Sequence, residues 1–168
     1  KLQEENSSEF VGYYTDYNTR NNQFPTIENW CLGAVPDSPF INDWLKEYEK
    51  CILSDDPDSY YDNNRELSWE ESVLGWKYHG CYFACQLVTR RNQNYRLTLI
   101  RADDDAFLYN LGIPVQWNNF NMVEILFVNK APGSQPKMIK IVSAVRNKID
   151  PFIKKGYHKK NSYWGKML

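Results

Sequence analysis

The chain has 168 residues, which suffice for one domain with a sizeable hydrophobic core. Its formal net charge is −1. A nucleic-acid partner would require a basic excess, so this nearly neutral balance argues against one. No apolar run approaches the roughly 20 residues needed to span a bilayer, and no secretory signal pattern is present. We expect residues 1–168 to form a single α/β domain of mixed short strands and several amphipathic helices, without a transmembrane segment.

The four cysteines have irregular spacing, which favours a reducing compartment over a disulfide framework. Cys81 and Cys85 are four residues apart with His79 nearby, a spacing loosely similar to that of metal ligands. The same spacing is typical of one apolar helix face, and we favour that interpretation. Aromatic residues make up 15% of the chain, which suits carbohydrate binding because sugar C–H faces pack on rings, but suits an ordinary core equally.

The first part of the chain predicts two strands. Residues 1–9 are polar, and we expect them to be flexible. Phe10–Thr15 has the composition of a short strand, and the Asn-rich stretch Asp16–Pro25 predicts a loop. Ile27–Val35 is a second strand-like run that delivers a polar residue, Asn29, close to the turn that follows.

A turn and a helix follow this second strand. Asp37 or Ser38 can cap the helix, and Pro39 fits its first turn, where the missing N–H costs nothing. The next apolar residues recur at helical spacing and predict one wide buried face: Phe40, Ile41, Trp44, Leu45, Tyr48, Cys51 and Ile52.

The remaining elements are shorter or less regular. Ser68–Glu71 reads as a capping box that begins a helix, which we expect to break at Gly80 and to resume over Cys81–Arg91. Tyr95–Ala102 predicts a strand with Leu97 and Leu99 on one face, and Met122–Val128 a strand or a short helix. The apolar residues from Met138 to Ile149 repeat at helical spacing, and Asp150-Pro151 should end or kink that helix.

Asp103-Asp104-Asp105 is the most acidic run in the second half of the chain. Asp103 and Asp105 have the spacing of a DXD motif, in which two carboxylates chelate one hard cation. They also precede Ala106–Leu111 and Gly112, which read as a short helix with acids in its first turn and glycine at its C-cap. We favour the helix interpretation. A metal-dependent hydrolase using Asp103 and Asp105 ranks low because no histidine is placed to complete its site.

One stretch resembles a known family. E-N-W-C-L-G-A-V-P-D-S-P-F-I-N-D-W-L, residues 28–45, is similar to a segment of the capsular polysaccharide synthesis glycosyltransferases. These belong with the DXD-containing sugar transferases that include the yeast initiating mannosyltransferase and the large clostridial glucosylating toxins. The resemblance continues through Y-F-A-C-Q-L-V and M-I-K-I-V-S-A-V-R-N-K-I-D to S-Y-W near the end of the chain. It implies a GT-A-like fold, that of nucleotide-diphospho-sugar transferases, of which residues 1–168 would be the C-terminal part.

The resemblance also implies roles for individual residues. Asn29 would contact the donor sugar or acceptor, with Trp30 packed beside it. Ser162 and Trp164 match an S-x-W on a mobile loop that closes over the diphosphate, and we expect residues 157–168 to be flexible. His158 and Lys160 would neutralise diphosphate charge. Lys159 stands where the toxin branch has an acidic metal ligand, and we therefore expect no metal bound by this tail.

The expected function is transfer of a hexosyl group from a nucleotide-diphosphate sugar to a glycan or polysaccharide acceptor. The complete enzyme would use Mn²⁺ or Mg²⁺, held by a DXD motif in an N-terminal half that this chain lacks. Such an enzyme would be cytoplasmic, or peripheral at a membrane through other parts of the protein. The alternative is a non-catalytic glycan-binding or interaction domain that uses the aromatic-rich surface and needs no nucleotide.

Overall fold

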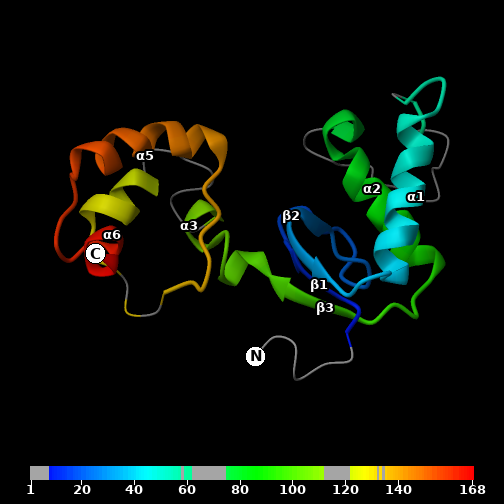
Figure 1. The fold of residues 1–168 in the computed structure, drawn as a ribbon, viewed down its shortest axis with the longest axis horizontal. Coiled ribbons are helices and arrows are strands. Elements are labelled where there is room, and N and C mark those ends of the chain that lie inside the picture. The colour runs from blue at the N-terminus through cyan, green and yellow to red at the C-terminus, as the bar shows by residue number, and fades with distance from the viewer. Residues whose placement is uncertain (1–7, 58, 62–74, 112–121, 132, 134) are drawn as a thin grey trace. The chain divides into compact units, whose positions relative to one another are not determined.

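The computed structural model describes residues 8–57, 59–61, 75–111, 122–131, 133 and 135–168, and the chain forms two compact units, Lys1–Arg101 and Ala102–Leu168 (Figure 1). Each unit has its own hydrophobic core. The predicted mixed α/β class is confirmed, with one three-stranded sheet and several helices. The predicted capping box at Ser68–Glu71 and the C-cap at Gly112 lie outside the described residues.

The sheet belongs to the first unit and has the order β2-β1-β3. Its strands are β1 (Phe10–Tyr14), β2 (Ile27–Ala34) and β3 (Leu97–Arg101), and all three lie where the sequence predicts them. β1 runs antiparallel to β2 and parallel to β3. The central strand is therefore the first one in the chain, and its parallel neighbour is the last strand of the unit.

Helix α1 (Pro39–Ile52) begins as predicted, with Ser38 as its N-cap and Pro39 in its first turn. The Ser38 hydroxyl accepts a hydrogen bond from the Ile41 N–H at 3.4 Å. The predicted apolar face was too wide, because Leu45 and Ile52 are about half exposed. At about 100° per residue, they lie roughly 110–130° around the helix from the stripe that is buried. That stripe consists of Phe40, Trp44, Glu47 and Cys51.

Glu9 also differs from expectation, because it is buried rather than part of a frayed end. Its carboxylate accepts the Phe40 N–H at 3.0 Å, in the first turn of α1. A carboxylate there satisfies one of the N–H groups that a helix leaves unpaired at its start, and it complements the helix dipole. Glu9 thus ties the residues before β1 to the start of α1.

Helix α2 (Gly75–Arg91) is continuous, so the predicted break at Gly80 is wrong. Gly80 lies against two aromatic rings, and a Cβ added there would be 3.6 Å from the Tyr48 ring and 3.8 Å from the Tyr61 ring. Both distances are ordinary van der Waals contacts, so this glycine packs within the helix pair without changing the direction of the backbone. The two helices lie side by side and form the core of the unit together with β1 and β2 (Figure 1).

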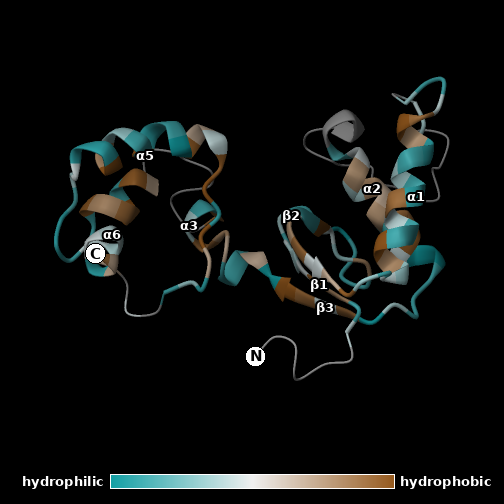
Figure 2. Ribbon diagram, in the orientation of Figure 1, coloured by the Kyte–Doolittle hydropathy of each residue, from teal (hydrophilic) through white to brown (hydrophobic). Residues whose placement is uncertain are grey.

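The second unit is built from short helical elements. They are a 3₁₀ turn η1 (Ala102–Asp104), α3 (Leu108–Leu111), a π-helical segment η2 (Glu124–Val128), α5 (Ser143–Lys155) and α6 (Tyr163–Met167). The core gathers residues from α3, η2 and α5, with Tyr163 and Trp164 of α6 packed against it. Figure 2 shows the contrast between the hydrophobic η2 and the largely hydrophilic α5. Of the two predictions for Met122–Val128, the short helix is confirmed.

Helix α5 starts and ends later than the sequence predicts. It begins at Ser143, so that Met138 and Ile141 precede it and are exposed. Pro151 lies inside the helix on its exposed side, and the helix continues past it to Lys155. The actual end is Gly156, whose φ of 64° is left-handed and suits the glycine C-cap of a helix.

Candidate functional site

The sequence-predicted residue Asn29 lies on an irregular part of β2. Gly12 of β1 pairs with Leu32, whereas Tyr14 pairs with Ile27. β1 therefore advances by two residues while β2 advances by five, and residues 28–31 form a bulge opposite Tyr13. Bulges re-aim side chains and are frequent next to active sites. This bulge redirects the E-N-W sequence away from regular strand alternation.

Glu28 is the anchor of the bulge. Its side chain is buried, and its Oε2 accepts hydrogen bonds from Trp30 Nε1 at 2.6 Å and from the Tyr82 hydroxyl at 3.2 Å. A carboxylate removed from water requires such donors, since an unsatisfied one would cost several kcal/mol. Tyr82 comes from α2, so the carboxylate links the bulge to the helix behind it.

Asn29 and Trp30 follow Glu28 directly in the chain. Asn29 is exposed, and its Oδ1 accepts a hydrogen bond from the Tyr82 hydroxyl at 3.1 Å. The Trp30 ring stacks on Tyr13 with centroids 5.2 Å apart and planes 19° apart. We call Tyr13, Glu28, Asn29, Trp30 and Tyr82 the Asn29 site. The site combines the exposed amide of Asn29, which the Tyr82 hydroxyl holds in place, with the half-buried indole ring of Trp30.

His79 lies one helical turn before Tyr82, against the back of the Asn29 site. It is buried, and its ring meets that of Tyr82 edge to face at 5.2 Å. Burial lowers the pKa of His79 below its ordinary value of 6.5, because the charged imidazolium is desolvated. The folded protein therefore holds this imidazole in its neutral form at neutral pH.

This burial predicts a pH dependence of stability. The unfolded chain binds a proton at His79 at a higher pH than the folded chain does, so acidification favours unfolding. We expect the melting temperature to fall as the pH drops through about 6.5, the ordinary pKa, and on toward the lower folded pKa. Thermal melts of wild type and His79→Asn at pH 7.5 and 5.5 test this. An equal loss in both proteins would assign the effect to other groups.

Two cysteines of α2, Cys81 and Cys85, lie close to Tyr82 in the chain. Burial raises the pKa of Cys81 and places that of Cys85 well above its usual range. Thiolate chemistry at neutral pH is therefore disfavoured for both residues. All four cysteines are free, and within the described residues no three or more His, Cys, Asp or Glu side chains gather where they could hold a metal ion.

The acidic run at 103–105 lies in the second unit, before α3. Asp103 and Asp104 belong to η1, and α3 begins only at Leu108, later than predicted. Asp105 Oδ1 accepts the backbone N–H groups of Lys137 and Met138. Asp105 thereby fixes the segment that leads to α5, which gives this carboxylate a structural role.

The four predicted tail residues all lie in the second unit, whereas Asn29 and Trp30 lie in the first. Ser162 is fully buried as the N-cap of α6. Its hydroxyl donates to the Lys159 carbonyl at 2.7 Å and accepts the Gly165 N–H at 3.1 Å. Trp164 packs on Phe127 with centroids 5.5 Å apart. His158 and Lys160 are exposed. The tail that we expected to be flexible thus makes defined contacts within its unit.

We expect Ser162→Ala to lower the free energy of unfolding by about 1 kcal/mol, the usual cost of losing an N-cap hydroxyl. Urea denaturation of wild type, Ser162→Ala and Ser162→Thr measures this, because threonine retains a hydroxyl that can cap. A Ser162→Ala variant as stable as wild type would show that the capping bond contributes nothing.

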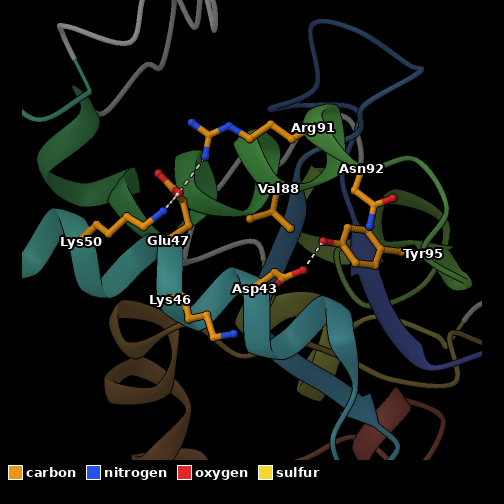
Figure 3. A pocket seen from close by; sticks show the side chains of 8 residues that line it. All are labelled: Asp43, Lys46, Glu47, Lys50, Val88, Arg91, Asn92 and Tyr95. Atoms are coloured by element: carbon orange, nitrogen blue, oxygen red, sulfur yellow. Dashed lines mark hydrogen bonds and ion pairs between the residues drawn. The ribbon is translucent and has the colours of Figure 1, made fainter.

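A groove lies between α1 and the end of α2 (Figure 3). This groove has a volume of about 300 Å³ and is lined mainly by charged and polar side chains. Glu47 is buried and meets Arg91 at 2.8 Å and Lys50 at 3.1 Å, while Asp43 accepts from the Tyr95 hydroxyl at 2.7 Å. Burial, helped by the bond to Asp43, raises the pKa of Tyr95 to about 12. The charged groups Asp43, Glu47, Lys50 and Arg91 thus have partners within the protein. The Glu47–Arg91 ion pair chiefly serves to join α1 to α2.

Comparison of the chain with family models, with curated proteins and with solved structures finds no match. Within the ranges that the structure describes, no helix is both long enough and apolar enough to cross a membrane.

Sequence reasoning identified two of the five residues of the Asn29 site. Glu28 directly precedes Asn29, and a carboxylate in an otherwise strand-like run is a signal that could have drawn attention to it. Tyr13 and Tyr82 carried no such signal, since they lie 16 residues before and 53 residues after Asn29 and reach it through strand pairing and helix packing.

Proposed function

We propose that this chain is the sugar-facing part of a glycosyltransferase that moves a hexosyl group from a nucleotide-diphosphate sugar to a glycan acceptor. The observation that carries the proposal is the Asn29 site. An exposed amide is fixed by Tyr82 on a strand bulge, beside the indole ring of Trp30. A few fixed polar groups next to an apolar ring give orientation and affinity for a ligand with both hydroxyl and C–H faces. The resemblance of residues 28–45 to the capsular polysaccharide synthesis glycosyltransferases supports the same assignment.

In this proposal Asn29 is the residue that touches the sugar. The Tyr82 hydroxyl and a hydrogen bond to the Cys81 side chain hold the amide in one orientation, so this exposed group needs no search over rotamers. Fixed dipoles aimed at groups whose charge changes during transfer stabilise the transition state more than mobile ones do. Trp30, held by Glu28 and stacked on Tyr13, would form the apolar wall beside the sugar.

No metal ligand is assigned to this chain. Asp105, the carboxylate best spaced with Asp103 for a cation, accepts two backbone N–H groups and is not arranged as a ligand. Among the residues that the structure describes, Asp103 and Asp105 therefore do not form a Mn²⁺ or Mg²⁺ site. Contact of Ser162 and Trp164 with the diphosphate of the donor sugar stays a prediction. Such contact would require the Ser162 hydroxyl to give up its hydrogen bonds at the start of α6.

The test is Asn29→Ala in the complete protein, assayed for transfer from a panel of UDP- and GDP-hexoses. We expect turnover to fall about tenfold or more, the cost of one contact that strengthens in the transition state. The melting temperature should barely move, because Asn29 is exposed. Asn42→Ala, an equally conservative change of an exposed asparagine on α1, is the matched control. Unchanged turnover, or a large loss of stability, would make Asn29 structural.

The second candidate function is that of a non-catalytic glycan-binding domain, and the composition of the Asn29 site is compatible with it. The Asn29 site consists of a carboxylate and neutral groups, and such a set can bind a glycan without any nucleotide. Calorimetric titration of the 168-residue chain with free oligosaccharides and with nucleotide sugars separates the two. Oligosaccharide binding that Asn29→Ala abolishes, in a complete protein that transfers no hexose, would support the binding domain.

A further inference from the structure

The two units carry opposite charge, although the whole chain is nearly neutral. The sequence of Lys1–Arg101 has 10 Lys and Arg against 16 Asp and Glu, a balance of −6. Ala102–Leu168 has 10 against 5, a balance of +5. The excess is concentrated further, since residues 138–168 hold eight Lys and Arg and a single acid, Asp150. A charge segregated to this degree creates a strong local positive potential.

Five of these lysines lie within the 13 residues from the end of α5 through α6. We call them the basic surface: Lys154, Lys155, Lys159, Lys160 and Lys166, all exposed. The backbone fixes them close together. Gly156 ends α5, the Lys159 N–H donates to the Phe127 carbonyl at 2.8 Å, and Ser162 joins Lys159 to Gly165. A Cβ added at Gly165 would overlap the Lys159 carbonyl oxygen, so Lys166 follows directly on the loop that carries Lys159 and Lys160.

Exposed apolar side chains are interleaved with these lysines. Tyr157 is 62% exposed, Met167 67% and Ile153 42%. Lys155 Nζ lies 5.9 Å from the centre of the Tyr157 ring, so cation and aromatic ring are presented side by side. This segment therefore offers a potential ligand both positive charges and exposed apolar side chains.

We infer that the basic surface docks this protein on a lipid bilayer that carries anionic head groups. Each lysine near such a surface is attracted by its negative potential, and Tyr157, Met167 and Ile153 can enter the boundary between head groups and acyl chains. The electrostatic attraction or the apolar insertion alone would give only marginal membrane binding, whereas the two together give stable, reversible binding. A nucleic-acid duplex would use the charges and leave the aliphatic Met167 and Ile153 without a partner. The inference uses none of the Asn29 site, although Lys160 is also a residue predicted to neutralise diphosphate charge.

The test is co-sedimentation of the 168-residue chain with vesicles of phosphatidylcholine alone and with 30% phosphatidylserine. We expect binding to the anionic vesicles at 0.1 M salt, at least tenfold weaker binding at 0.5 M salt, and none to phosphatidylcholine alone. Lys155→Glu/Lys160→Glu should weaken binding roughly 25-fold or more, at about fivefold per lysine. Tyr157→Ser should weaken it about fivefold at constant salt through lost ring burial.

The matched control is Lys46→Glu/Arg96→Glu, which changes the net charge equally at exposed positions of the first unit. It should change binding less than twofold, and melting curves should show all variants folded. Three results would overturn the inference: equal binding to neutral and anionic vesicles, equal loss in the control and the Lys155/Lys160 variant, or binding to duplex DNA without binding to anionic vesicles.

Discussion

Phe40→Ala should lower the free energy of unfolding by about 3–5 kcal/mol, the range for truncating a fully buried aromatic side chain. Phe40 has no exposed surface, and three other rings contact it. Phe10 lies 4.8 Å away between centroids, Tyr95 5.2 Å and Trp44 5.6 Å. These rings come from β1, the segment before β3, and α1, so the cavity would open where the sheet meets the helices. Urea denaturation followed by circular dichroism measures the loss.

Leu45→Ala is the control for Phe40→Ala. Leu45 lies on the same helix and looks equally apolar in the sequence, but it is 52% exposed. We expect the free energy of unfolding to change by no more than about 0.5 kcal/mol, as at most surface positions. Comparable losses for the two variants would mean that the buried stripe of α1 has been assigned to the wrong side of the helix.

Phe127→Ala should have an effect of similar size in the second unit, again about 3–5 kcal/mol. Phe127 is 1% exposed, and its ring lies 5.4 Å from Phe152 of α5 and 5.5 Å from Trp164 of α6. Its carbonyl also accepts the Lys159 N–H, so η2 supports the whole tail. Thermal melts followed by tryptophan fluorescence should show a lower midpoint and a red-shifted native emission, because Trp164 loses its apolar neighbour.

Met138→Ala is the matched control for the second unit, because Met138 is 38% exposed and precedes α5. It should leave both the midpoint and the emission maximum within error of the wild type. If Phe127→Ala left them unchanged as well, the tail would not depend on η2, and the interpretation of Ser162 and Trp164 as packed residues would be wrong.

The elements that the sequence predicted well are those whose signals are local. The strand over Ile27–Val35, the Ser38 cap and Pro39 at the start of α1 depend on backbone preferences of a few adjacent residues. Each one is present in the structure within a residue of the prediction.

The elements that were predicted wrongly depend on partners far along the chain. Glu47 is buried because Arg91 of α2 reaches it, and Glu9 is buried because the start of α1 accepts a carboxylate. Gly80 does not break α2, and it packs beside the Tyr48 and Tyr61 rings within the helix pair. In each case a tertiary contact outweighs a local preference, and periodicity within one helix cannot reveal that contact.

The Asn29 site shows the same division. Asn29 and Trp30 are adjacent in the sequence, so one motif indicates both. The register shift opposite Tyr13 and the hydroxyl of Tyr82 exist only once β2 has paired with β1 and α2 has packed behind it. Likewise, the whole-chain charge of −1 concealed the basic surface, because charges cancel in a sum but not in space.

The position of β1 in the sheet has a consequence for synthesis. Phe10 pairs with Ala34 of β2 and with Leu97 of β3, which are 24 and 87 residues later in the chain. At about 5–20 residues per second, a ribosome needs roughly 4–17 s to reach Leu97 after Phe10. Until then one edge of β1 has no partner strand, and such an open edge pairs readily with other chains. The nascent β1–β2 hairpin is therefore the species that chaperones would have to shield.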